Sequence, residues 1–144
     1  MGWSAALGAG LLLVGLAALP PFAGAELRAS LMQAFAPVCH QMPGRSFAVG
    51  GTPLAVCHRC IGLYAGLPLA AISFPWLRRW EGALDRNARW VLVGAALPLA
   101  IDWSGLHLGP WVNTAASQVL TGVVFGGAVG LYFTRALVRL AHRR

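Results

Sequence analysis

The sequence predicts an all-α integral membrane protein, built as a bundle of four transmembrane helices. Its 144 residues are 58% hydrophobic and only 10% charged, whereas a soluble domain carries about 25% charged residues. Four apolar segments are long enough to cross the hydrocarbon core of a bilayer, which takes about 20 residues of helix. Because the length suits one compact unit, we expect residues 1–144 to form a single membrane domain.

Each expected span is recognised by its length and by the few charged residues within it. The first carries no charge, whereas Arg59 lies near the start of the second, Asp102 near the end of the third and Arg135 near the end of the fourth. The spans cover about residues 3–23, 54–77, 90–108 and 115–138, and residues 26–53 form the sizeable loop outside the bilayer.

The first apolar segment has a second interpretation, as a signal peptide. Ala23, Gly24 and Ala25 have the small-x-small form of a cleavage site. However, no basic residue precedes the apolar run, and the run is long for a signal core. These two features favour a retained first span.

The distribution of arginine predicts the orientation of the bundle. One side of the membrane receives eight of the eleven basic residues and the other side receives three. The eight are Arg78, Arg79, Arg86, Arg89, Arg135, Arg139, Arg143 and Arg144, and the three are Arg28, Arg45 and Arg59. Since arginine accumulates on the cytoplasmic side, we expect both ends of the chain in the cytoplasm and the loop at 26–53 on the periplasmic face of the inner (cytoplasmic) membrane.

The partners that this composition favours are lipids rather than nucleic acids. The net charge of +7 would suit a nucleic acid, but the arginines flank apolar segments instead of forming one basic face. The sequence has no lysine, which excludes a Schiff base or an amine nucleophile. The bilayer is therefore the expected partner, and no protein partner can be named.

Rows of glycine predict close helix packing. Small residues four apart let two membrane helices approach each other, and such rows occur in the second and fourth spans. They are Gly62 and Gly66, and Gly122, Gly126 and Gly130. We expect these faces to build a tight bundle, and they are also candidates for contacts in a homo-oligomer.

The stretch from Cys39 to Gly66 carries the candidate chemistry, since it contains all three cysteines. Cys57 and Cys60 have CxxC spacing at the outer start of the second span, and residues three apart share one face of a helix. A helix N-terminus also stabilises thiolates. We expect turns at Pro43-Gly44 and Gly50-Gly51, after a short helix at 26–35, to fold Cys39 back over this pair.

Three cysteines and a histidine match the ligands of a tetrahedral zinc site. The candidate ligands are Cys39, His40, Cys57 and Cys60. His58 is less suited, because it points about 100° away from Cys57 on the helix. The leading hypothesis is an outward-facing metal site, most simply for zinc, with a structural role or a role in metal homeostasis.

Other uses of the cysteines remain open at this point. The CxxC pair could serve a membrane thiol–disulfide oxidoreductase with Cys39 as the resolving thiol, or the three thiols could simply pack as small side chains. A small transporter is a further alternative, although the inner two thirds of the spans lack the charges of an ion path.

Asp102 is an acid inside a span, which requires a counter-charge. An ion pair with Arg59 or Arg45 would lock the outer loop to the bundle. The same two arginines would offset the negative charge of a thiolate-rich site. Asp102 has two alternative roles. It could be the fourth ligand of the metal, a position for which His40 is the other candidate, or it could accept and donate protons.

Several of these residues form a pattern that resembles a known family. Cys39-His40-Gln41, Pro43, Arg45-Ser46-Phe47 and Cys57-x-Arg59-Cys60-x-Gly62-x-Tyr64-x-Gly66 resemble the signature of domain of unknown function 2085, a family of small prokaryotic membrane proteins. The likeness extends over about residues 32–130 and includes Asp102, while His58 occupies a position where the family more often has a small residue. The resemblance implies a multi-span membrane protein and marks Cys39, His40, Gln41, Arg45, Cys57, Arg59, Cys60 and Asp102, without implying an activity.

Overall fold

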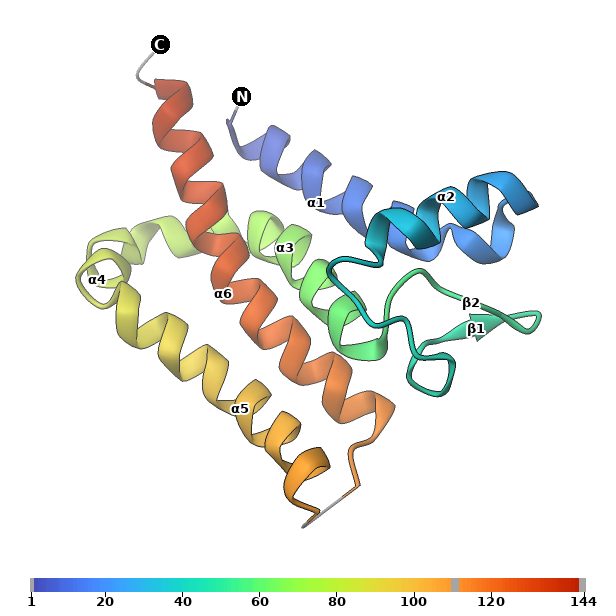
Figure 1. Cartoon of the computed structure of the whole chain (residues 1–144). Helices are drawn as coiled ribbons and strands as arrows, with labels where there is room; N and C mark the ends of the chain where they lie inside the picture. Colours follow the sequence, from blue (N-terminus) through green and yellow to red (C-terminus); the bar gives the residue numbers. More distant parts are fainter. Residues whose placement is uncertain (1, 110–111, 143–144) are drawn as a thin grey trace.

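The chain folds as an assembly of helices with one short hairpin (Figure 1). The computed structural model describes residues 2–109 and 112–142, apart from the side chains of residues 106 and 107. The α-helices are α1 (Gly2–Ala18), α2 (Ala25–Phe35), α3 (His58–Leu77), α4 (Glu81–Arg86), α5 (Ala88–Leu108) and α6 (Ala115–His142). Three short 3₁₀ turns, η1 (Pro20–Phe22), η2 (Pro43–Arg45) and η3 (Arg78–Trp80), and two strands, β1 (Ala48–Val49) and β2 (Thr52–Pro53), complete the described structure.

Each of the four expected spans contains a helix, but they differ in their suitability for crossing a bilayer. Among the described residues, two helical stretches are long and apolar enough, His58–Arg86 and Ala115–His142. Helix α1 is apolar but has only 17 residues, which rise about 26 Å against a hydrocarbon core of about 30 Å. The helix ends before Pro20 and Pro21, because proline has no N–H to continue it. The four-span arrangement therefore stays a prediction.

Helices α3 and α6 form the centre of the structure, and glycine allows their backbones to touch (Figure 1). A Cβ atom at Gly62 or Gly66 of α3 would collide with the backbone of α6, and one at Gly122 or Gly126 would collide with the backbone of α3. The predicted close packing is confirmed, and these glycine faces are covered by the chain itself. Gly127 faces open space instead.

Helices α1 and α5 flank this central pair (Figure 1). At one end of the structure, Gly2 lies against Leu137 of α6 and the indole of Trp3 donates a hydrogen bond to the carbonyl of Ala71, at 2.5 Å. The two termini of the described chain are therefore neighbours. The residues around Cys57 lie at the opposite end of α3.

A cluster of ion pairs holds α4 against the last turns of α6. Arg135 contacts Glu81 at 3.5 Å and Asp85 at 2.5 Å, and Arg139 contacts the same two carboxylates at 3.3 and 2.5 Å. The side chain of Arg135 is only 3% exposed, whereas that of Arg139 is 54% exposed. These ion pairs add to apolar packing at the same place, where Leu84 of α4 and Val138 of α6 lie against a buried cluster of Ala70, Phe74 and Leu131.

The segment between α1 and α3 forms a compact unit over the other end. The amide of Ala55 donates a hydrogen bond to the carbonyl of Ala17, at 2.9 Å, which ties this segment to the end of α1. Gly50 and Gly51 have φ values of 57° and 79°, as a two-residue hairpin turn between β1 and β2 requires. The short helix and both turns that the sequence predicted in this loop are confirmed.

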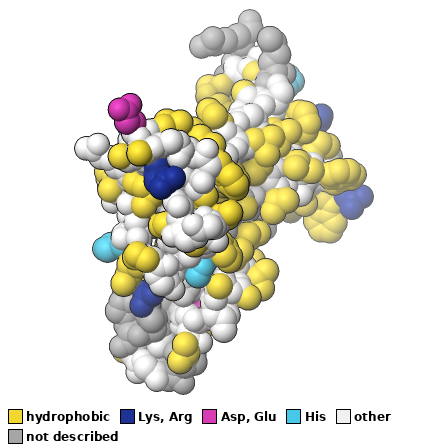
Figure 2. Space-filling model, turned by 90° about the vertical axis from the view of Figure 1, so that its right-hand side faces the viewer, with side chains coloured by type: hydrophobic (Ala, Val, Ile, Leu, Met, Phe, Trp, Pro, Cys, Tyr) yellow, Lys and Arg dark blue, Asp and Glu magenta, His cyan; other side chains and the backbone are white. Residues whose placement is uncertain are grey.

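Large hydrophobic side chains remain exposed along the helices. Figure 2 shows them spread over much of one face, with few charged groups among them. Over the structure as a whole, the exposed side chains of this kind include Leu69, Ile72, Trp76, Val93, Leu97, Ile101 and Val124. Such a surface is expected where lipid rather than water contacts the protein.

Candidate metal centre

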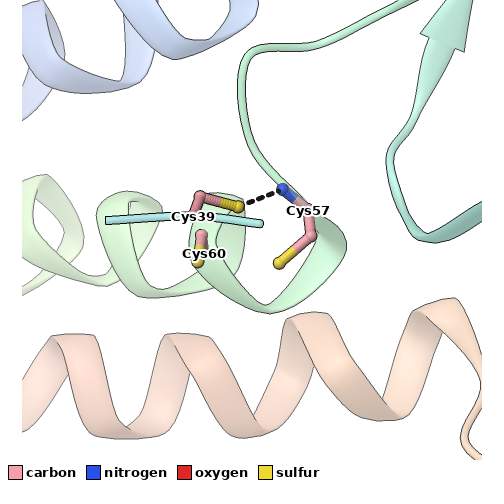
Figure 3. Close-up of side chains that lie close together, drawn as sticks. All are labelled: Cys39, Cys57 and Cys60. Carbon is pink, nitrogen blue, oxygen red and sulfur yellow. Dashed lines mark hydrogen bonds between the residues drawn. The ribbon is translucent and has the colours of Figure 1, made fainter. Parts of the chain in front are cut away.

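Three sulfur atoms lie together at the start of α3 (Figure 3). The Sγ atoms of Cys39, Cys57 and Cys60 are all within 4.8 Å of one another, and the three residues are free cysteines. They come from the segment after α2, the residue before α3 and the first turn of α3. The predicted approach of Cys39 to the CxxC pair is confirmed.

Cys39 is held in place by the way α2 ends. Its amide donates a hydrogen bond to the carbonyl of Phe35, at 3.0 Å. Its side chain is 5% exposed and belongs to a buried cluster with Phe35, Ala17 and Val56. Because this cluster includes residues from both α1 and the segment before α3, apolar packing positions the sulfur.

Gln41 fastens the same segment through its side chain. Its amide nitrogen donates hydrogen bonds to the carbonyls of Met32, at 2.6 Å, and Ala55, at 2.9 Å. Its backbone has a φ of 49°, in the left-handed region that non-glycine residues seldom occupy. Gln41 therefore connects the end of α2 to the segment that leads into α3, and it fixes the path of the chain beside Cys39.

The N-terminus of α3 provides the electrostatic environment of the sulfurs. Cys57 is the N-cap residue, and its backbone amide donates a hydrogen bond to Sγ of Cys39, at 3.2 Å. Cys60 lies in the first turn of the same helix. The positive end of the helix dipole favours negative charge at this position, so the arrangement suits sulfurs in their thiolate form.

The two nearby histidines differ from the cysteines in their placement. His40 is exposed and lines the pocket beside the sulfurs, but it is not part of the group whose ligand atoms lie within 4.8 Å. The ring of His58 packs against Phe47, with centroids 4.4 Å apart. Among the described side chains, the compact group thus consists of sulfur alone.

Asp102 forms an ion pair with Arg59, and not with Arg45. Nη2 of Arg59 lies 2.5 Å from Oδ2 of Asp102, and the side-chain amide of Asn113 donates to the same oxygen at 3.1 Å and also to the backbone carbonyl of Asp102. The acid is only 7% exposed. The ion pair that the sequence predicted with Arg59 or Arg45 is present with Arg59, and it joins α3 to α5 rather than the outer loop to the bundle. The carboxylate is engaged there instead of joining the sulfurs.

A pocket of about 360 Å³ opens beside the three sulfurs. Its polar lining includes His40, Arg45, Arg59 and Gln118 in addition to the cysteines, and its apolar lining is Val38, Met42 and Trp103. Sequence reasoning did not assign Asn113, Gln118 or Trp103 to the site. Two of them could have been found from the sequence, because Asn113 and Gln118 are polar residues close to the start of the fourth expected span.

Comparisons with known proteins extend the family resemblance. The family model for DUF2085, described as a predicted membrane protein, matches residues 39–132. A similar protein, uncharacterized protein MJ1492 of Methanocaldococcus jannaschii, is 30% identical over 107 residues, which cover 74% of this chain and 68% of that protein. No solved structure matches. The family segment begins at Cys39 and includes all three site cysteines and Asp102.

Proposed function

Because this chain belongs to the DUF2085 family of predicted membrane proteins, we propose that it is a multi-pass protein of the inner membrane that binds a metal ion at its periplasmic face. The ligands are Cys39, Cys57 and Cys60, and zinc is the simplest ion for them. The metal either stabilises the outer segment or is passed on in metal homeostasis.

The observation that supports this proposal most directly is the spacing of the sulfurs. With zinc–sulfur bonds of about 2.3 Å, two thiolates on one tetrahedral ion are about 3.8 Å apart. All three Sγ atoms lie within 4.8 Å of one another, so small side-chain movements suffice to bring them to that distance. Thiolate sulfur is a soft ligand that favours zinc or copper over magnesium or calcium.

The surrounding charges also favour bound thiolates. Arg45 and Arg59 both line the pocket beside the sulfurs, and the positive end of α3 adds to their effect. Arg59 is held by Asp102, so its position is set before any metal binds. A divalent ion with three thiolates carries a net charge of −1, which one free guanidinium offsets.

The membrane part of the proposal rests on the arginine distribution and on the helices. Arg78, Arg79 and Arg86 belong to the region that joins α3 to α5, and Arg89 lies in the first turn of α5, at the end opposite to the cysteines. The proposed four spans place this region in the cytoplasm and the sulfurs in the periplasm. A transporter is less favoured, because the backbones of α3 and α6 touch along the glycine rows and leave no path between them.

The metal content of purified protein tests the proposal. We expect about one zinc ion per chain by elemental analysis, and we expect Cys57→Ser and Cys60→Ser each to lose it. His58→Ala is the matched control, because His58 lies between the two cysteines but packs against Phe47. Metal-free wild-type protein that folds normally after expression with added zinc would rule the proposal out.

Thiol–disulfide exchange is the second candidate function, and the placement of Cys57 at the N-cap of α3 favours it. Cys57 and Cys60 would form the exchanging pair, with Cys39 as the resolving thiol. Alkylation of the intact protein at controlled redox potentials distinguishes the two functions. Thiols that change state with the potential support exchange, whereas thiols that zinc protects at every potential support metal binding.

A further inference from the structure

The three-sulfur site is open on one side. A tetrahedral ion takes four ligands, and among the described side chains only Cys39, Cys57 and Cys60 bring ligand atoms into one compact group. Asp102 is held by Arg59 and Asn113. All three cysteines line the same pocket, so an ion bound to them would present its fourth position to the pocket.

The pocket contains hydrogen-bond donors that the described protein leaves unused. Gln118 of α6 is only 6% exposed and lines the pocket, yet its side-chain amide makes no hydrogen bond to another described residue. The guanidinium of Arg45 has no ion-pair partner among the described residues, and Nε of Arg59 is buried without a hydrogen bond. A buried donor without a partner, such as Nε of Arg59, costs free energy, which a ligand in the pocket would recover.

Apart from His40, the remaining walls of the pocket are apolar. Val38, Met42 and Trp103 line it, and the volume of about 360 Å³ greatly exceeds the roughly 30 Å³ that one water molecule occupies in the liquid. Small-molecule sites start at about 300 Å³. The pocket therefore suits a small molecule with a short apolar body and one anionic, soft donor atom.

We propose that this pocket admits a small thiol, which binds as the fourth ligand of the metal through its sulfur. The inference rests on the proposed metal site and names the ligand that completes it. The incoming thiol gives its proton to solvent, its sulfur forms one bond to the metal and a water molecule leaves. No electrons are transferred, because every sulfur and the metal keep their oxidation states.

The charges around the pocket favour this step. A divalent ion with three thiolates has a net charge of −1, and the fourth thiolate changes it to −2. Arg45 stabilises the added charge, and the amide of Gln118 donates to the incoming sulfur. The site thereby becomes a place of ligand exchange, where a thiol-bearing carrier reaches the metal from the periplasmic side.

Cobalt substitution tests the inference with the full-length protein in detergent. Co²⁺ replaces zinc in thiolate sites, and its sulfur-to-metal charge-transfer absorption grows with the number of Co–S bonds. Addition of 2-mercaptoethanol should raise this absorption by about one third, as the bonds increase from three to four. Ethylene glycol, which has a hydroxyl in place of the thiol, should leave it unchanged.

Variants locate the thiol within the pocket. Arg45→Gln should weaken the apparent affinity for 2-mercaptoethanol about tenfold while Co²⁺ still binds, because it removes a charge near the added thiolate. Gln118→Leu should weaken it severalfold. The matched control is Gln33→Leu, since Gln33 is an exposed glutamine of α2 outside the pocket.

Three negative outcomes are distinguishable, and they lead to two different conclusions. If Co²⁺ binds through three sulfurs and 2-mercaptoethanol does not change its spectrum, the thiol site is wrong and the metal site stands. The same conclusion follows if His40→Ala alters the Co²⁺ spectrum of the protein without added thiol, since His40 would then be the fourth ligand of the metal. If no Co²⁺ binds to folded protein, the proposed function itself is wrong.

Discussion

Arg59 and Asp102 join α3 to α5 by an ion pair with 2.5 Å between Nη2 and Oδ2. The carboxylate is nearly buried, and Asn113 donates a further hydrogen bond to it. Arg59 also lines the pocket beside the sulfurs. This pair therefore connects the stability of the bundle to the electrostatics of the candidate metal centre.

Asp102→Asn should destabilise the protein while sparing its metal. The substitution leaves the charge of Arg59 without a partner in a partly buried position. We expect a cost of about 3 kcal/mol, the low end for a broken buried pair, because the side chain of Arg59 is partly exposed. Thermal unfolding in detergent measures the loss. Elemental analysis should still find about one metal per chain, because Asp102 lies outside the sulfur group. Loss of metal from folded Asp102→Asn would instead make Asp102 a ligand.

Gly126→Ala should destabilise the contact between α3 and α6. A Cβ atom at this position would collide with the backbone carbonyl of Leu63, so the helices must separate, at a cost of about 2 kcal/mol or more. Gly127→Ala is the matched control, since a Cβ there meets nothing within 4 Å. Thermal unfolding should show a lower Tm for the first variant alone. Equal Tm values for the two would mean that the helices do not pack through Gly126.

Arg135→Ala should destabilise the protein more than Arg139→Ala, although both arginines contact Glu81 and Asp85. The side chain of Arg135 is buried, and its loss leaves a cavity and removes the inner partner of both acids, at about 3 kcal/mol. Arg139 is mostly exposed, so its loss should cost below about 1 kcal/mol. The comparison of Tm values tests this order, and the reverse order would contradict the packing of α4 on α6.

Gln41→Ala should weaken metal binding without removing a ligand. The side chain of Gln41 holds the segment beside Cys39 by hydrogen bonds to two backbone carbonyls. Without these bonds, the sulfur of Cys39 must be brought into position when the metal binds. We expect the metal affinity to fall about tenfold, as removal of supporting hydrogen bonds typically does. Competition with a chelator measures the affinity. Gln33→Ala on the exposed side of α2 is the control, and equal affinities in the two variants would show that Gln41 plays no part.

The proposed orientation can be tested with reporters of membrane topology. A phosphatase that is active only in the periplasm should be active when inserted between Gly50 and Gly51 and inactive when fused after residue 144. A fluorescent protein that folds in the cytoplasm should show the opposite pattern. Because the arginine bias sets the orientation, replacing Arg78, Arg79, Arg86 and Arg89 together with glutamine should raise periplasmic activity at the C-terminal fusion. Phosphatase activity at the C-terminus of the unaltered chain would contradict the four-span arrangement.

Local patterns determined much of this protein from the sequence. Apolar runs of sufficient length predict helices wherever they occur, and each of the four runs contains one. The CxxC spacing places Cys57 and Cys60 near each other through the geometry of one helix. The glycine rows likewise predict a close helix contact, because a small residue every four positions lines one face. These features depend on neighbours in sequence, so no knowledge of the rest of the fold was needed.

Only the tertiary structure decided which distant residues meet. Asp102 had two candidate partners, and the packing of α5 along α6 beside α3 selected Arg59 over Arg45. Gln41 belonged to the motif, but its role as a clamp depends on two carbonyls supplied by Met32 and Ala55. The pocket joins Arg45 from the outer segment to Gln118 from α6. Such contacts arise when separate elements pack against one another, and the spacing of residues along the chain carries no record of that arrangement.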